Sequence, residues 1–135
     1  MSNALDAKQM QTIQQYDAQQ RYNYLLKEVV KNAEIWLLVD EHGCVMLNTE
    51  EEYCVPVWPN QEFAQAWATE EWSHCKAQAI SLAKWHNRWT HGLEDDELAS
   101  VVFPDQRNEG LIFFPDEFDF ELQQQAKKLS NKKNR

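Results

Sequence analysis

The chain is organised around residues 54–72, CVPVWPNQEFAQAWATEEW, which carry three of its six tryptophans. Val55, Val57 and Trp58 are β-branched or aromatic, and such side chains are enriched in strands. Pro56 has no backbone N–H to donate, so a strand that contains it lies at a sheet edge or at a break in pairing. This stretch therefore predicts a short strand that cannot be hydrogen-bonded along both of its sides.

A helix is predicted immediately after this strand, over residues 60–71. Asn60 is a favourable N-cap residue, because its side chain can accept a hydrogen bond from the first turn. Phe63 and Trp67 are one turn apart and share a face. Trp72 falls on the opposite side of the helical wheel. We therefore expect Trp72 to lie beyond the helix end or to face away from the other two aromatic rings.

The remaining strands are predicted from short apolar runs bounded by polar turns, at residues 34–40, 44–47, 77–82, 98–103 and 111–114. The first of these runs has apolar residues on both faces, with Trp36 and Leu38 on one side, which is typical of a central strand. Gly43 lies in a hairpin turn and can adopt a positive φ. The last two runs form a second hairpin.

Further helices are predicted over residues 19–31, over residues 81–90 and from residue 115 onward. Gly92 is the expected C′ residue that ends the helix over 81–90. Residues 1–18 have weak helical spacing in a background of glutamines, so we expect a polar arm there. One long helix that continues from this arm is the alternative.

Interleaved strands and helices predict an α+β domain with a single mixed or antiparallel sheet, helices packed on it, and hairpins near both ends. A length of 135 residues is that of one domain. We expect three segments, which are the arm over residues 1–18, the domain over 19–126 and a basic tail over 127–135.

The net charge of −9 restricts the partners that the chain can bind. An acidic body repels nucleic acid and anionic membranes, so neither is an expected partner. The five basic residues of the tail are expected to be a solvated helix end.

The compartment is inferred from the N-terminal sequence and from the cysteines. The N-terminus lacks the basic and apolar regions of a signal peptide, and no apolar run is long enough to span a membrane. Three cysteines without a C-x-x-C pair are expected to be buried thiols. We therefore expect a cytoplasmic protein.

Several short motifs occur in order between Tyr22 and Leu122. They are VPVWP at 55–59, A-x-x-W ending at Trp67, ISL at 80–82, RW at 88–89, GL at 92–93, VVFP at 101–104 and PDEF at 115–118. This series resembles a bacterial family of unknown function, family 2750. The resemblance implies a small single-domain bacterial protein and brings no activity, cofactor or catalytic residue with it. A proline often precedes the Gly-Leu pair in that family, whereas this chain has His91.

Histidine and cysteine are the residues that would carry metal binding or thiol chemistry. His74 and Cys75 are adjacent, so their side chains would point to opposite faces of a regular strand. No pair of close ligands has the spacing of a zinc site, and we expect neither a metal nor a cofactor. An enzyme acting on a small substrate could use Cys75 with His86. We otherwise expect His86 to lie on the buried face of its helix.

The excess of tryptophan favours a different function, the binding of another protein. Tryptophan beside arginine is typical of interface hot spots. We expect Trp72, Arg88 and Trp58 to be partly exposed and close together, with Glu70 and Glu71 nearby. The sequence thus favours a non-enzymatic interaction module, of an adaptor or immunity-like kind, whose partner is another protein or a second copy of the chain. The enzyme with Cys75 and His86 is the alternative.

Overall fold

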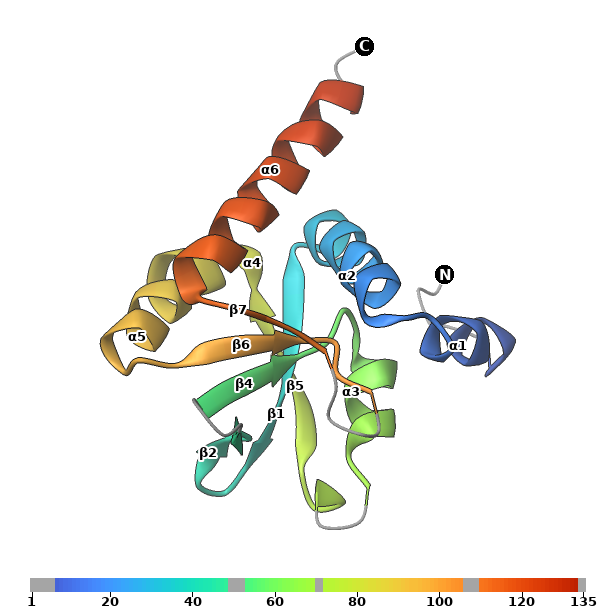
Figure 1. Ribbon diagram of the computed structural model, residues 1–135, viewed down its shortest axis with the longest axis vertical. Coiled ribbons are helices and arrows are strands. Elements are labelled where there is room, and N and C mark those ends of the chain that lie inside the picture. Colours follow the sequence, from blue (N-terminus) through green and yellow to red (C-terminus); the bar gives the residue numbers. More distant parts are fainter. Residues whose placement is uncertain (1–6, 49–52, 70–71, 106–109, 134–135) are drawn as a thin grey trace.

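The computed structural model describes residues 7–48, 53–69, 72–105 and 110–133, along which groups of helices and groups of strands are interleaved (Figure 1). The helices are α1 (Ala7–Gln14), α2 (Ala18–Asn32), α3 (Gln61–Trp67), α4 (Leu82–Lys84), the π-helical turn η2 (Trp85–Trp89), α5 (Thr90–Asp95) and α6 (Pro115–Lys133). The strands are β1 (Glu34–Asp40), β2 (Gly43–Cys44), β3 (Leu47–Asn48), β4 (Tyr53–Val57), β5 (Lys76–Ser81), β6 (Ala99–Val102) and β7 (Leu111–Phe113). The predicted α+β class is confirmed.

The described strands form two small sheets, of which the first is antiparallel and the second is mixed. The first sheet has the order β2-β1-β5, and β1 pairs antiparallel with both neighbours. Trp36 and Leu38 therefore lie on an inner strand, as predicted. The second sheet has the order β3-β4-β6-β7, in which β4 and β6 are parallel and the other pairs are antiparallel.

One isolated bridge joins the two sheets, where we had expected a single continuous sheet. It pairs Trp36 of β1 with Trp58, which follows β4. Along the chain, Pro56 lies between Cys54, the last β4 residue that pairs with β3, and Trp58, which forms the bridge. On the opposite side of β4, Pro56 is the partner of Val101 of β6. Because proline has no N–H, it is suited to the position where β4 changes partners. The predicted break in pairing at Pro56 is confirmed.

One hydrophobic core extends from α1 to α6. Helix α2 contributes the face that the sequence predicted, and its buried apolar residues are Tyr22, Leu25, Leu26 and Val29. Buried side chains from both sheets, from α3 and from α6 belong to the same cluster. A smaller cluster of Cys54, Ala99 and Val101 covers the other side of the β4–β6 pair. Both faces of these parallel strands are therefore buried.

The N-terminal segment is helical but does not continue into α2. Helix α1 buries Ile13, and Asp17 then caps α2. The Asp17 side chain accepts from the Gln20 N–H at 2.8 Å, and the Gln20 side chain accepts from the Asp17 N–H at 3.0 Å. This reciprocal capping box ends the first segment and starts the second. The alternative of one long helix is therefore wrong.

The helix that follows β5 is longer than predicted and contains a wide turn. The backbone N–H and the hydroxyl of Thr90 both donate to the Trp85 carbonyl, the hydroxyl at 3.0 Å. Gly92 lies inside α5, so its predicted role as the C′ residue is wrong. The helix continues because Leu93 packs into the core with 4% of its surface exposed. Glu97, with φ 59°, supplies the left-handed residue beyond the helix end.

Helix α6 begins at Pro115 and projects beyond the rest of the molecule at its C-terminal end (Figure 1). The Phe114 N–H donates to the Glu117 carboxylate at 3.0 Å and so closes the first turn. Among the described residues, no helix combines the length and the apolar character needed to cross a membrane.

Candidate functional site

Trp58 was expected to be partly exposed, and this expectation is wrong. Its side chain is fully buried. The bridge to Trp36 holds its backbone between the two sheets, and the Trp67 ring from α3 covers it at a centroid distance of 5.2 Å. Pro56 marked a break in pairing rather than an exposed edge, so the residue two positions later became part of the core.

The other members of the expected patch do not lie together. Trp72 is half-buried against Trp67, with ring centroids 5.9 Å apart, and Arg88 is exposed on η2. Trp72 precedes β5 and Arg88 follows it, so they lie toward opposite ends of this strand (Figure 1). A six-residue strand spans about 20 Å. Glu70 and Glu71 lie outside the described residues.

The same strand separates Cys75 from His86, so the structure does not form the pair required by the enzyme alternative. Cys75 is buried at the start of β5 beside His74. The His86 side chain is 49% exposed, contrary to expectation, and its Nδ1 lies 2.8 Å from Asp119 Oδ1. Gln123 of α6 also contacts Asp119, at 2.9 Å. His86 thus joins the wide helical turn to α6.

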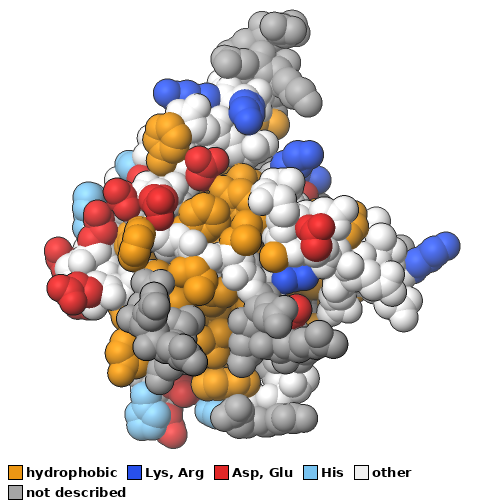
Figure 2. Space-filling view, viewed as in Figure 1, with side chains coloured by type: hydrophobic (Ala, Val, Ile, Leu, Met, Phe, Trp, Pro, Cys, Tyr) orange, Lys and Arg blue, Asp and Glu red, His pale blue; other side chains and the backbone are white. Residues whose placement is uncertain are grey.

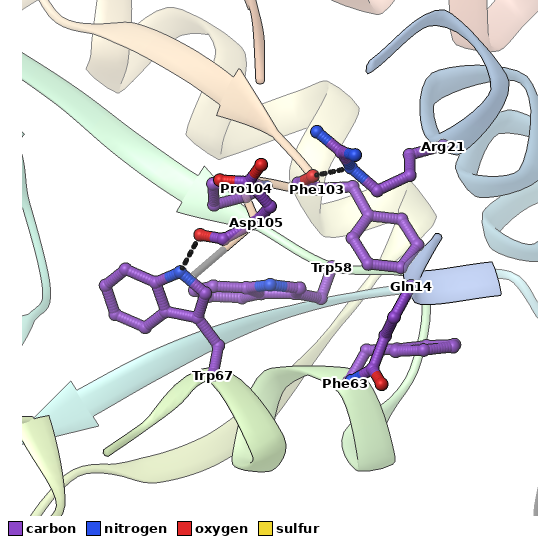
Figure 3. A pocket seen from close by; sticks show the side chains of 8 residues that line it. All are labelled: Gln14, Arg21, Trp58, Phe63, Trp67, Phe103, Pro104 and Asp105. Atoms are coloured by element: carbon purple, nitrogen blue, oxygen red, sulfur yellow. Dashed lines mark hydrogen bonds between the residues drawn. The ribbon is translucent and has the colours of Figure 1, made fainter. Parts of the chain in front are cut away.

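A pocket of about 230 Å³ lies at the carboxyl ends of the parallel strands β4 and β6 (Figure 3). Ligand sites often lie at this end of parallel strands, because the chain leaves the sheet there and opens a crevice. The lining residues come from α1, α2 and α3 and from the segments that follow β4 and β6: Gln14, Arg21, Trp58, Phe63, Trp67, Phe103, Pro104 and Asp105.

Arg21 and Trp67 of this pocket donate hydrogen bonds to backbone carbonyls. Arg21 is 5% exposed and donates from Nε to the Phe103 carbonyl at 3.0 Å and from Nη1 to the Tyr16 carbonyl at 2.6 Å. The Trp67 indole N–H donates to the Asp105 carbonyl at 2.8 Å, as Figure 3 shows. The described lining contains no cysteine, histidine, serine or lysine. Its described lining therefore combines aromatic walls with a few polar groups, without a thiol, hydroxyl or amine nucleophile beside a base.

A second apolar surface lies on β7 and the first turns of α6, and we call it the β7–α6 surface. Phe113, Phe120 and the acids Asp116, Glu117 and Glu121 line one hollow of it, and the exposed Ile112 and Phe114 lie on the side of β7 opposite Phe113. Phe114 is 57% exposed and Phe120 is 58% exposed. A hollow of about 470 Å³ is lined by Phe113, Phe120 and the three acids. This part of the chain is therefore an aromatic patch with an acidic rim.

The periodicities of β7 and α6 explain why these aromatic side chains remain outside. Alternation along β7 directs Phe113 toward Tyr22, with ring centroids 4.9 Å apart, and leaves Phe114 exposed. Along α6, two residues correspond to about 200° of rotation. Phe118 is consequently fully buried while Phe120 faces outward.

Charge is distributed unevenly around this surface (Figure 2). Acidic side chains gather over α5 and the start of α6, whereas lysines lie along the projecting end of α6. The pKa of Tyr22, which stacks on Phe113, is raised by burial and then by the negative charge of Glu121. The Glu121 carboxylate is thus close enough to affect Tyr22.

Sequence reasoning missed the β7–α6 surface, although a signal for it was present. The run PDEFDFE places Phe118 and Phe120 two positions apart at the start of a predicted helix. Residues with this spacing cannot share a helix face, so one of the two rings had to face away from the core.

Comparison with known proteins supports the resemblance suggested by the motifs. The family described as Protein of unknown function (DUF2750) matches residues 22–122. The chain belongs to this family. No curated protein and no solved structure matches it. The description of the family names no activity.

Proposed function

We propose that this DUF2750 chain is a non-enzymatic protein-interaction module, of an adaptor or immunity-like kind, which binds its partner through the β7–α6 surface. The observation that carries the proposal is the exposure of Phe114 and Phe120, at 57% and 58%. Phe120 borders the hollow that Asp116, Glu117 and Glu121 also line, and exposed aromatic side chains rimmed by polar residues are typical of binding sites.

The partner is a protein segment that combines a large apolar side chain with lysine or arginine. The apolar side chain would enter the hollow between Phe113 and Phe120. The basic groups would lie against Asp116, Glu117 and Glu121, since complementary charges increase the association rate and disfavour wrong partners. The net charge of −9 also attracts a basic partner at longer range.

Two observations favour binding over catalysis. The described lining of the pocket in Figure 3 holds no nucleophile with a base beside it. An enzyme of the alternative kind would need Cys75 and His86 to meet, but these residues lie beyond opposite ends of β5. Nucleic acid and anionic membranes are disfavoured as partners by the acidic rim of this surface.

The experiment is a selection from a displayed library of random twelve-residue peptides on the wild-type chain, with depletion on the Phe120→Asp variant. We expect enriched peptides to carry an aromatic or long aliphatic residue next to lysine or arginine. Binding of a synthetic copy, measured by calorimetry, should weaken at least tenfold in Phe120→Ala. Tyr53→Ala is the matched control, because Tyr53 is 56% exposed outside the β7–α6 surface.

Enriched peptides without basic residues, or equal binding by the wild-type chain and Phe120→Ala, would contradict the proposal. Sedimentation analysis tests a second copy as the occupant. We expect the wild-type chain to be a monomer. A dimer that dissociates in Phe120→Ala would mean that the partner is a second copy of the chain.

A further inference from the structure

Three side chains with different donor atoms meet where β1 ends and β5 begins. They are the carboxylate of Asp40, the imidazole of His74 and the thiol of Cys75, and one ligand atom from each lies within 4.8 Å of the other two. His74 Nε2 lies 3.6 Å from Asp40 Oδ2 and 3.8 Å from Cys75 Sγ. A carboxylate, an imidazole and a thiol together are the ligand types of zinc sites.

The register of the sheet explains this meeting. Val39 of β1 pairs with Lys76 of β5, so the next residues outward, Asp40 and Cys75, lie at the same end of the two strands. His74 lies in the turn before β5, where side chains do not alternate between two faces. The expectation that adjacent His74 and Cys75 point apart assumed a regular strand, and it is wrong for this reason.

The two distances from His74 Nε2 to the other donors are close to those around a tetrahedral ion. Bonds of about 2.3 Å to sulfur and about 2.0–2.1 Å to nitrogen or oxygen place the donors of a zinc site about 3.3–3.6 Å from one another. The separations of 3.6 Å and 3.8 Å are therefore close to those that the ion requires.

Neighbouring groups orient two of the three donors. The His42 backbone N–H donates to Asp40 Oδ1 at 2.8 Å, and the other carboxylate oxygen, Oδ2, faces His74. The Cys75 backbone is held at both of its polar groups. Its N–H donates to the Trp72 carbonyl at 2.9 Å, and its carbonyl accepts from the Gln65 amide at 3.1 Å. Such outer hydrogen bonds are a regular feature of metal sites, because they fix the ligands before the ion binds.

The charges of the donors also suit a divalent cation, because its charge would equal that of one carboxylate plus one thiolate.

We propose that Asp40, His74 and Cys75 bind one Zn²⁺ ion, with a water molecule in the fourth position. On binding, the Cys75 S–H bond breaks, sulfur bonds to zinc and one proton is released to solvent. The site can be reached from outside, because the His74 side chain is 60% exposed and that of Asp40 is 23% exposed. Three protein ligands leave one coordination position of a tetrahedral zinc ion for water.

Zinc titration of the untagged full chain tests this proposal. The protein is first treated with EDTA, exchanged into metal-free buffer and kept reduced, and it then competes for Zn²⁺ with a chromophoric chelator. We expect one equivalent to bind, with release of a proton. His74→Ala and Cys75→Ser should each weaken binding by at least about 100-fold, because the loss of an outer group alone costs about 10–100-fold.

The control variants remove the same residue types, a histidine and a cysteine, at positions outside the proposed site. His91→Ala removes a 72% exposed histidine beside Glu94, and Cys54→Ala removes a buried cysteine of the second sheet. Both should leave zinc affinity unchanged. Circular dichroism of every variant shows whether the fold is retained, and His74→Ala, at an exposed turn residue, should retain it.

Cobalt substitution provides a second readout that depends on the thiol itself. The Co²⁺ form should show a thiolate-to-cobalt absorption band in the near ultraviolet, and Cys75→Ser should abolish that band. No zinc binding by the wild-type chain, equal binding by folded His74→Ala, or a cobalt spectrum without the thiolate band would each overturn the proposal.

Discussion

Trp36 and Trp58 exchange two backbone hydrogen bonds, of 3.0 and 2.8 Å, and so make the only bridge between the two sheets within the described residues. Trp58 is fully buried at this junction, whereas Trp36 remains half-buried. Trp58, which was expected at a binding surface, thus lies in the core and joins the two sheets.

Truncation of Trp58 should therefore be much more damaging than truncation of Trp72. We expect Trp58→Ala to lower the free energy of unfolding by about 3–5 kcal/mol, because it empties a closed site in the core. Trp72→Ala should cost about 1 kcal/mol, since this ring is half-buried. Urea denaturation followed by circular dichroism measures both losses, and equal losses would contradict this assignment.

Two phenylalanines on the first turns of α6 form another matched pair. Phe118 is fully buried, and Phe118→Ala should cost about 3–5 kcal/mol in unfolding free energy. Phe120→Ala should change it by less than about 0.5 kcal/mol, as at an exposed position. Thermal and urea unfolding check this prediction. A large loss in Phe120→Ala would mean that the ring packs on the body and is unavailable to a partner.

The hydroxyl of Thr90 supports the wide turn of the helix. Thr90→Val keeps the shape of the side chain but removes its bond to the Trp85 carbonyl, and we expect a loss of about 1 kcal/mol. Thr12 makes a similar bond to the Lys8 carbonyl on an exposed helix, so Thr12→Val should have little effect. Comparison of the two urea midpoints tests the difference, and a similar change in both would contradict it.

Removal of the Ser100 hydroxyl should not lower stability, in contrast to removal of the Thr90 hydroxyl. Its hydroxyl is buried on β6, and it has no hydrogen-bond partner within the part of the chain that the structure describes. Burying an unsatisfied hydroxyl costs free energy. Ser100→Ala should therefore leave stability unchanged or raise it by about 1 kcal/mol. A loss of stability in this variant, measured by urea denaturation, would show that the hydroxyl is bonded.

Stability should also fall in alkaline solution. Burial and the nearby charge of Glu28 raise the pKa of Tyr24 from its ordinary 10.0 to about 12. Tyr24 in the unfolded chain ionises near pH 10 while the folded chain keeps it neutral, so the stabilisation is full below pH 10 and is lost as pH rises to about 12. Tyr24→Phe should reduce this decline. The check is the urea midpoint at pH 9 and pH 11.5, with Tyr53→Phe as an exposed control.

Local patterns predicted the elements well where one signal was dominant. The alternation over residues 34–40 matches the bounds of β1, and Asn60 caps α3 through a bond from the Phe63 N–H. The missing N–H of Pro56 predicted a break in pairing. Each of these features depends on the residue and its chain neighbours, so they can be read without knowledge of the tertiary fold.

Exposure could not be read in the same way, because it depends on contacts between distant segments. Trp58 became core once β1 paired beside it and Trp67 covered it. The helix continued past Gly92 because Leu93 packs into the core, and His86 lies next to Asp119 of α6. The Asp40–His74–Cys75 cluster likewise depends on the pairing of β1 with β5 and on an irregular turn, neither of which appears in the spacing of the ligands.

The parallel pairing of β4 with β6 has a consequence for the synthesis of this protein. Cys54 pairs with Ala99, so β4 leaves the ribosome 45 residues before the strand that completes its ladder. All of α3, β5, α4, η2 and α5 is made in that interval. Until β6 emerges, the apolar β4 strand has an open edge, and such edges bind other nascent chains or chaperones. Slow elongation through residues 54–99 would lengthen this exposure and should increase aggregation of the newly made chain.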